Sequence, residues 1–309
     1  MDLSPTTIGL LLTSFAAAIL NGAVGYGFSS VVTPIALFWV TNRLLNPSLV
    51  LVELGVNVVM LVRERRFLRA TYRRALPVIA GLVPGVVLGS VALLLIAPIG
   101  VRVIVYSALL PLTLLQLMGF QRRIVRERAL AGGVGAGIGF LYSLTTISGP
   151  PLALFWRNQG LAKSEFRCTM AQIRVAEASF TSVSYLALGL FTPASVGLVP
   201  VLLLPVVLGV PLGTLLLQSL SRDFFSRLVM AVDGLIVSYG LYRVVVPVGW
   251  LTSQEGLVLL LLCVAAIGLL ALRALARLPT IWATPEERRR ERIHGFTDEP
   301  GPVASGPGP

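Results

Sequence analysis

Two apolar stretches of this chain are too long for one clean membrane span, and glycine or proline interrupts each of them. The first stretch covers 6–38 and is interrupted at 21–27, and the second covers 129–156 and is interrupted at 145–151. Paired interrupted segments in the two halves of a membrane protein are typical of a substrate site near the bilayer midplane. The two interruptions lead into nearly identical hexapeptides, Pro34-Ile-Ala-Leu-Phe-Trp39 and Pro151-Leu-Ala-Leu-Phe-Trp156.

The composition is that of an integral membrane protein. Hydrophobic residues make up 55% of the chain, charged residues only 13%, and the mean hydropathy is +0.85. A membrane helix needs about 20 mostly apolar residues, and the chain supplies such segments repeatedly. The N-terminus has no basic region before its first apolar segment, so we expect no cleaved signal peptide. The predicted segments are 6–40, 46–62, 76–97, 101–119, 129–156, 168–190, 195–219, 228–246 and 255–275.

An internal repeat covers most of the chain. Besides the repeated hexapeptide, Leu82-Val-Pro-Gly-Val-Val-Leu-Gly89 in the third segment is similar to Leu203-Leu-Pro-Val-Val-Leu-Gly209 in the seventh. Segments one to four therefore pair with five to eight, and the ninth has no partner. The predicted units are a first membrane repeat, a second repeat, an extra transmembrane helix and a disordered basic cytoplasmic tail, at 1–120, 121–247, 248–278 and 279–309.

The basic residues predict how the two halves are oriented. If each interrupted segment crosses the membrane fully, the 25 lysines and arginines show no bias to one face. If each dips in and returns, all of them share one face except Arg43, Arg102, Arg243 and the intramembrane Arg174. Basic residues favour the cytoplasmic side, so the second arrangement is preferred. We predict an all-α polytopic protein of the cytoplasmic (inner) membrane, with its N-terminus outside and its tail in the cytoplasm.

In this fold each inverted repeat contains one re-entrant broken helix and three transmembrane helices, and one extra C-terminal transmembrane helix follows. Each half-helix start at a break leaves free N–H groups that favour an anion. Glycines at 22, 25 and 27 allow a ligand to approach the backbone closely. The alternative is that small residues here only allow close helix packing. The substrate-binding candidates at the breaks are Asn21, Gly25, Tyr26, Gly27, Ser29, Thr145, Thr146, Ser148 and Gly149.

Ionisable residues inside apolar segments are costly and mark function by default. Glu53 and Asn57 share one helix face at i, i+4, and Arg174 and Glu177 share another at i, i+3. These segments are partners in the repeat, so the two pairs can face each other. We predict that Arg174 binds the substrate's negative charge and that coupling involves Glu53, Asn57, Glu177 or the single Asp233. The alternative is a structural ion pair between Arg174 and Glu177, with Glu53 bound to a neighbour.

Signatures of other protein classes are missing. The single histidine, His294, lies in the tail, so the membrane segments hold no histidine-based metal site or Ser-His dyad. Cys168 and Cys263 lie in apolar runs and are expected to be packing residues rather than a disulfide. We predict no metal, cofactor or enzymatic activity. The net charge of +11 comes mainly from short loops between spans, which indicates topology and lipid contact rather than nucleic-acid binding.

Three sequence runs carry a resemblance to a known family. They are Gly25-Tyr-Gly-Phe-Ser-Ser-Val-Val-Thr-Pro34, Gly139-Phe-Leu-Tyr-Ser-Leu-Thr-Thr-Ile-Ser-Gly-Pro-Pro-Leu152 and Gly160-Leu-Ala-Lys-Ser-Glu-Phe-Arg-Cys-Thr169. Over about 8–246 the chain resembles the sulfite exporter TauE/SafE family of membrane permeases. The resemblance implies a duplicated architecture and transport of small sulfur-containing anions. The chain departs from the family pattern at Ser29, Ser30 and Thr146, where glycine is common.

These observations together predict a secondary transporter that moves sulfite, organosulfonates or similar anions and is coupled to protons or to the membrane potential. Its partners are then a small anion and membrane lipid, and the sequence is compatible with a homo-oligomer. The first alternative is a membrane-embedded enzyme acting on lipid or isoprenoid phosphates, which would need an acidic or histidine cluster at one interface. The second is an assembly subunit, for which the basic tail is the only argument.

Overall fold

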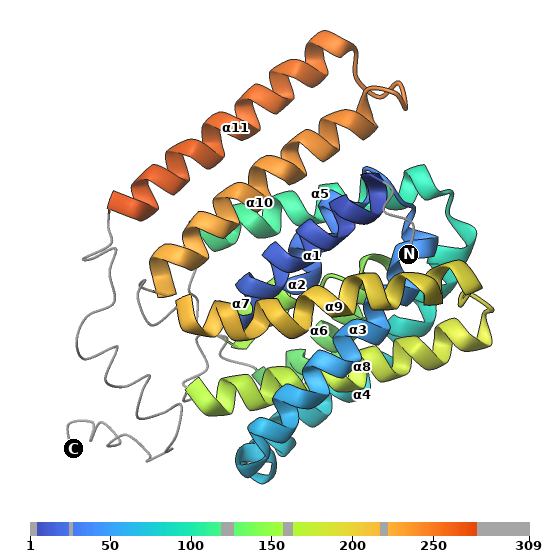
Figure 1. Cartoon of the computed structure of the whole chain (residues 1–309), viewed down its shortest axis with the longest axis vertical. Helices are drawn as coiled ribbons and strands as arrows, with labels where there is room; N and C mark the ends of the chain where they lie inside the picture. The colour runs from blue at the N-terminus through green and yellow to red at the C-terminus, as the bar shows by residue number, and fades with distance from the viewer. Residues whose placement is uncertain (1–4, 25–26, 119–126, 157–162, 217–221, 277–309) are drawn as a thin grey trace.

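The computed structural model of the chain describes residues 5–24, 27–118, 127–156, 163–216 and 222–276. Every regular element in these ranges is a helix (Figure 1), which confirms the all-α class. The helices in chain order are α1 Pro5–Val24, α2 Phe28–Ala36, α3 Asn42–Arg63, the short 3-10 helix η1 Arg65–Phe67, α4 Leu68–Leu95, α5 Pro98–Leu117, α6 Glu127–Thr145, α7 Gly149–Trp156, α8 Lys163–Ala187, α9 Pro193–Leu216, α10 Arg222–Val245 and α11 Ser253–Ala276.

Among the described residues, six helices are long and apolar enough to cross a bilayer, namely α1, α3, α4 with η1, α5, α9 and α11. The chain is therefore a multi-pass membrane protein. α8 and α10 have similar lengths, 25 and 24 residues, but each contains five charged residues. In Figure 1, α8, α9, α10 and α11 run in alternating directions, as consecutive spans do.

Helix starts in the second half follow local sequence signals. α9 begins at Pro193, where a missing N–H costs nothing. Thr192 and Ser195 exchange hydrogen bonds between backbone N–H and hydroxyl groups at 2.9 and 3.1 Å. Thr252 and Glu255 make the equivalent capping box before α11, at 2.8 and 3.3 Å. These reciprocal bonds satisfy donors that a helix N-terminus would otherwise leave free.

Each interrupted segment consists of a long helix followed by a short one. α1 has 20 residues and α2 has 9, while α6 has 19 and α7 has 8. At about 1.5 Å per residue, the long helix can reach across the apolar layer and the short one covers less than half of it. α2 packs back on α1, whereas α7 lies against α5 and α8. The arms are thus unequal in length, and the two halves arrange them differently.

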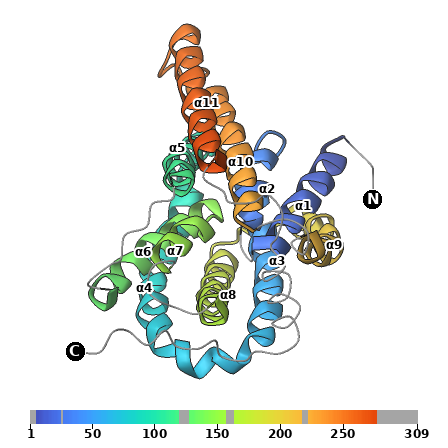
Figure 2. The ribbon, with the colours of Figure 1, turned by 90° about the vertical axis from the view of Figure 1, so that its left-hand side faces the viewer.

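The helices pack around two apolar centres. One is formed by α4, α6, α7 and α8, with Leu82 and Trp156 among its fully buried side chains. The other is formed mainly by α1, α2, α3, α5, α9 and α10. Along α8, Ile173 belongs to the first centre and Ala178 to the second. Figure 2 shows α8 between α3 and α4, and α8 has extensive contacts with both helices.

The most extensive helix contacts, between α4 and α6 and between α1 and α9, bring backbone against backbone. A Cβ on Gly85 would lie 2.0 Å from the carbonyl oxygen of Ala136, and one on Gly135 would lie 2.1 Å from that of Val78. In the other pair, a Cβ on Gly213 would lie 1.9 Å from the carbonyl oxygen of Ile19. Glycine allows this approach, and close packing replaces the hydrophobic driving force that lipid does not supply.

Gly22 corrects one expectation from the sequence. Its helix, α1, continues to Val24, so Gly22 lies inside the helix and not in the break. A Cβ on Gly22 would be 2.1 Å from the carbonyl oxygen of Val210 in α9. At this position the glycine allows close helix packing, which is the alternative given above, because the contact with α9 leaves no room for a side chain.

Replacing Gly135 by alanine is expected to destabilise the protein by about 1–3 kcal/mol, since the new methyl group would overlap a backbone carbonyl that cannot move away. Gly137 is the matched control on the same helix, because a Cβ there meets nothing within 4 Å. Gly137→Ala should stabilise α6 by about 0.5–1 kcal/mol through helix propensity. Melting temperatures in detergent measure both changes. Equal shifts for the two variants would contradict the close α4–α6 contact.

Candidate functional site

The two helix breaks lie where backbone takes unusual conformations. Gly27 has φ 101° immediately before α2, and Thr146 has φ 62° between α6 and α7. A positive φ is easy for glycine but rare for a β-branched residue, and it costs about 1–3 kcal/mol unless the surroundings hold it. Thr146 is held through its backbone N–H, which donates to Tyr142 O at 2.6 Å, and its hydroxyl, which donates to Thr145 O at 2.6 Å.

A hydrogen bond joins the two interrupted segments. Thr33 Oγ1 in α2 lies 3.0 Å from Thr146 Oγ1 at the second break, and both residues are fully buried. The two breaks are not equivalent in register, however. The first ends at Gly27, seven residues before Pro34, and the second ends at Ser148, three residues before Pro151. The second break therefore meets the middle of α2 and not its first turn.

Arg174 of α8 forms a buried ion pair with Glu53 of α3. Arg174 Nη2 is 2.6 Å from Glu53 Oε1, and the two residues are 4% and 1% exposed. α3 and α8, the spans that the repeat expected from the sequence would pair, thus face each other. The structural pair considered above, Arg174 with Glu177, is replaced by Arg174 with Glu53. Asn57 donates to the backbone carbonyl of Glu53 at 2.7 Å, so its amide contacts the helix backbone and not the carboxylate.

Glu177 binds the second break. Ser148 Oγ donates to Glu177 Oε2 at 2.6 Å, and both residues are fully buried. Ser148 directly precedes Gly149, the first residue of α7. The carboxylate therefore lies at the start of a helix, where free N–H groups and the helix dipole favour a negative charge.

The polar cluster formed by Glu53, Tyr142, Ser148, Arg174 and Glu177 (the acid–arginine cluster) is drawn from four places in the chain. Tyr142 is almost fully buried in α6, and its charged neighbours are Glu53, Glu177 and Arg174. The cluster lies at the border of the two apolar centres, because Ile138 and Ile173 belong to one and Tyr142 and Ala178 to the other. It contains one cation and two carboxyl groups.

The other predicted site residues are distributed around this cluster. Thr145 is the last residue of α6, and its hydroxyl donates to Leu141 O at 2.6 Å and accepts from the backbone N–H of Ile147 at 3.2 Å. Asn21 and Ser29 are buried in α1 and α2. Gly25 and Tyr26 lie outside the described residues. Asp233 is separate from the others, because it sits on α10 beside Thr113 of α5.

Three residues near the site were not singled out from the sequence as site residues, namely Thr33, Asn46 and Tyr142. Asn46 Nδ2 donates to Leu144 O at 2.8 Å and ties the last turn of α6 to α3. A sequence signal for it existed, since Asn46 precedes Glu53 by seven residues and lies on the same helix face. Thr33 and Tyr142 occur inside apolar runs, where a single hydroxyl is common, so only the tertiary contacts identify them.

The described residues hold no group of three or more His, Cys, Asp or Glu side chains that could bind a metal ion. Both cysteines are free thiols, as expected, with Cys168 buried and Cys263 partly exposed. The acid–arginine cluster offers hydrogen-bond donors and ionisable groups inside a membrane protein. This chemistry suits binding of a small anion and transfer of protons.

Comparison with known proteins identifies the family. The family model described as "Sulfite exporter TauE/SafE" matches residues 10–241, which is most of the chain. The match ends within α10 and leaves α11 outside it. No curated protein and no solved structure matches the chain. The chain therefore belongs to the sulfite exporter TauE/SafE family and is a membrane transporter, not an enzyme.

Proposed function

We propose that the protein is a secondary transporter that carries sulfite, organosulfonates or related small anions across the cytoplasmic membrane, coupled to protons or to the membrane potential. The family supports the class of anion. The observation that carries the proposal is the buried cluster at the second break, where Ser148 binds Glu177 and Glu177 lies one turn from Arg174. Membrane-depth breaks of this kind occur where a helix terminus faces a substrate.

In this proposal Arg174 is the main substrate ligand, because its planar fork presents several donors to an oxyanion. Donors at the breaks complete the site, namely Asn21, Gly25, Tyr26, Gly27, Ser29, Thr145, Thr146, Ser148 and Gly149. Glu53, Asn57, Glu177 and Asp233 serve coupling. The described conformation buries Thr146, Ser148 and Glu177 completely. Anion entry and release therefore require helices to move, as in alternating access.

The contacts support a two-fold repeat with halves at 1–120 and 121–247, and the distribution of basic residues supports its inversion. α4 packs on α6 as α9 packs on α1, and α4 packs on α8 as α9 packs on α3. The partner helices α3 and α8 contact each other, and so do α5 and α10. If each helix is replaced by its proposed partner in the other half, every one of these contacts becomes itself or another of these contacts, as a two-fold axis requires. In such a protein the substrate lies between the repeats, which is where α3 and α8 meet.

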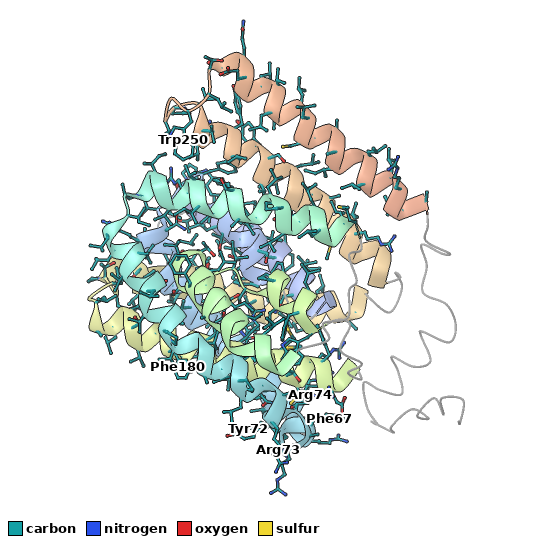
Figure 3. All side chains as sticks on the ribbon, turned by 180° about the vertical axis from the view of Figure 1, so that it is seen from behind. Phe67, Tyr72, Arg73, Arg74, Phe180 and Trp250 are labelled. Carbon is teal, nitrogen blue, oxygen red and sulfur yellow. The ribbon has the colours of Figure 1, made fainter. Side chains whose placement is uncertain are left out.

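The positions of basic and aromatic side chains support the proposed orientation. Figure 3 shows Arg73 and Arg74 beside Phe67 and Tyr72 at one end of the molecule, and Trp250 at the opposite end. Tyr72 and Trp250 are exposed, as aromatic residues at the two membrane interfaces are. The basic end is then cytoplasmic, and the Trp250 end is outside.

Purified protein in liposomes should take up labelled sulfite, sulfonates or thiosulfate, and Arg174→Ala should lower uptake about 100-fold. Removing one member of a buried charge pair costs about 2–5 kcal/mol, and each 1.4 kcal/mol is about tenfold. Because the substitution leaves Glu53 without its ion-pair partner, the melting temperature must be measured alongside uptake. Arg174→Lys is a second variant, which keeps the positive charge but lacks the planar guanidinium group. Wild-type uptake in a folded Arg174→Ala protein would reject the role of Arg174.

Single cysteines at positions 160 and 192, in a chain without Cys168 and Cys263, test the topology. We expect an impermeant maleimide to label position 192 in intact cells and position 160 only after permeabilisation, because the two positions flank α8, which crosses the membrane once from inside to outside in the proposed topology. The chain without cysteines is the control for background labelling. Labelling of both positions from the same face would refute inversion.

A further inference from the structure

Four polar atoms of the acid–arginine cluster are buried without a hydrogen-bond partner among the described residues: Glu53 Oε2, Tyr142 Oη, Arg174 Nε and Glu177 Oε1. Buried polar atoms are normally paired, so several unpaired atoms in one place call for an explanation. These atoms come from α3, α6 and α8, and the Tyr142 hydroxyl lies within interaction range of the Glu53 carboxyl group without a hydrogen bond of good geometry. A missing ligand that contacts all three helices would account for them together.

The unpaired atoms are of two chemical kinds. The Arg174 Nε–H and the Tyr142 hydroxyl are donors and suit an oxyanion. Glu53 Oε2 and Glu177 Oε1 are carboxyl oxygens, which accept when ionised and repel an anion. They suit a proton, because a protonated carboxyl group becomes a donor and loses its charge. The free atoms of the cluster thus match an anion and a proton taken together better than either alone.

The groups that would attract an anion are already bound by the protein's own carboxylates. Glu53 is paired with the guanidinium of Arg174, and Glu177 accepts from Ser148 at the start of α7. With both carboxyl groups ionised, the three charged side chains sum to one negative charge. A substrate anion would add a second negative charge at close range in a buried site, where electrostatic repulsion is strong.

Apart from α8, the helices packed against α3 supply no further cation to the cluster among the side chains that the structure describes, and on α6 the described titratable side chain is Tyr142. α2 and α9 contain no ionisable residue. On α5, Arg102 donates to Val40 O and Tyr106 to Pro34 O, away from the carboxylates. On α4, the basic side chains of Arg69, Arg73 and Arg74 are exposed. Among the described side chains no further cation neutralises this site, and protonation of a carboxyl group would do so.

We propose that the anion and one proton bind together, with Glu53 as the proton acceptor and Tyr142 as a further substrate-binding residue. This inference rests on the proposed function. When Glu53 is protonated, its ion pair with Nη2 of Arg174 is broken. The guanidinium and the Tyr142 hydroxyl then both donate hydrogen bonds to the anion. By linkage, proton and anion raise each other's affinity by the same factor. Translocation of both would make the protein an anion–proton symporter.

Calorimetry with methanesulfonate tests this proposal on the full chain in detergent. Methanesulfonate keeps one negative charge over the whole pH range of the experiment, unlike sulfite, so any pH dependence belongs to the protein. We expect uptake of one proton per bound anion, measured in two buffers of different ionisation enthalpy. If one proton is taken up with each anion, the Kd should rise about tenfold for each unit by which the pH is raised over the range where uptake is observed. This measurement on wild-type protein does not depend on whether a variant folds.

Glu53→Gln mimics the protonated carboxyl group and should bind methanesulfonate with little pH dependence and without proton uptake. Glu177→Gln should retain the pH dependence. Tyr142→Phe should weaken binding about tenfold without changing its slope with pH, because one hydrogen bond to a charged group is worth about tenfold in affinity. Tyr239→Phe, at an exposed position on α10, and Glu255→Gln, at an exposed position on α11, are the matched controls.

The outcomes separate this inference from the proposed function. Methanesulfonate binding that is independent of pH and takes up no proton would overturn the symport proposal and leave the anion transporter intact. Loss of the pH dependence in Glu177→Gln but not in Glu53→Gln would overturn the role of Glu53. Wild-type affinity in Tyr142→Phe would overturn the role of Tyr142. Failure of methanesulfonate, sulfite and thiosulfate to bind at any pH would reject both proposals.

Discussion

Backbone polar groups at a helix break have no water to bind inside a bilayer, and this constraint governs the structure. An interrupted helix is tolerated at membrane depth only where protein buries it or where it lines an aqueous cavity. Here the second break is buried, and its polar groups bind within the protein. Thr146 binds Thr33 and its own neighbours, and Ser148 binds Glu177. The break is thus stabilised by residues of the proposed substrate site.

Close helix packing around the cluster gives this arrangement its geometry. Contacts at Gly85, Gly135 and Gly213 bring helices of different halves into backbone contact and leave little freedom within each pair. The acid–arginine cluster lies between the two apolar centres, on helices that contribute to both. Packed cores resist continuous deformation and tend to move as units. A polar border between two such units is a suitable place for a transporter to open and close.

Much of the fold could be predicted from the sequence, because membrane spans can be identified from the length and hydropathy of apolar segments. Every expected segment contains a helix, and the second break falls inside the predicted range. The first break was placed too early, since α1 runs through Asn21 and Gly22 to Val24. Local sequence could not show this, because glycine is equally common in breaks and in helix contacts. Asp233 lies on α10 beside Thr113, and its part in coupling stays a prediction.

Composition and short-range pattern are enough to establish a multi-pass helical protein with two interrupted segments and a few intramembrane charges. How these charges combine follows from the tertiary structure alone. Glu53 and Arg174 are far apart in the chain, and their pairing depends on α3 lying against α8. The inclusion of Tyr142 depends on α6 reaching the same point. Partner choice between distant residues is set by helix packing, which no local pattern encodes.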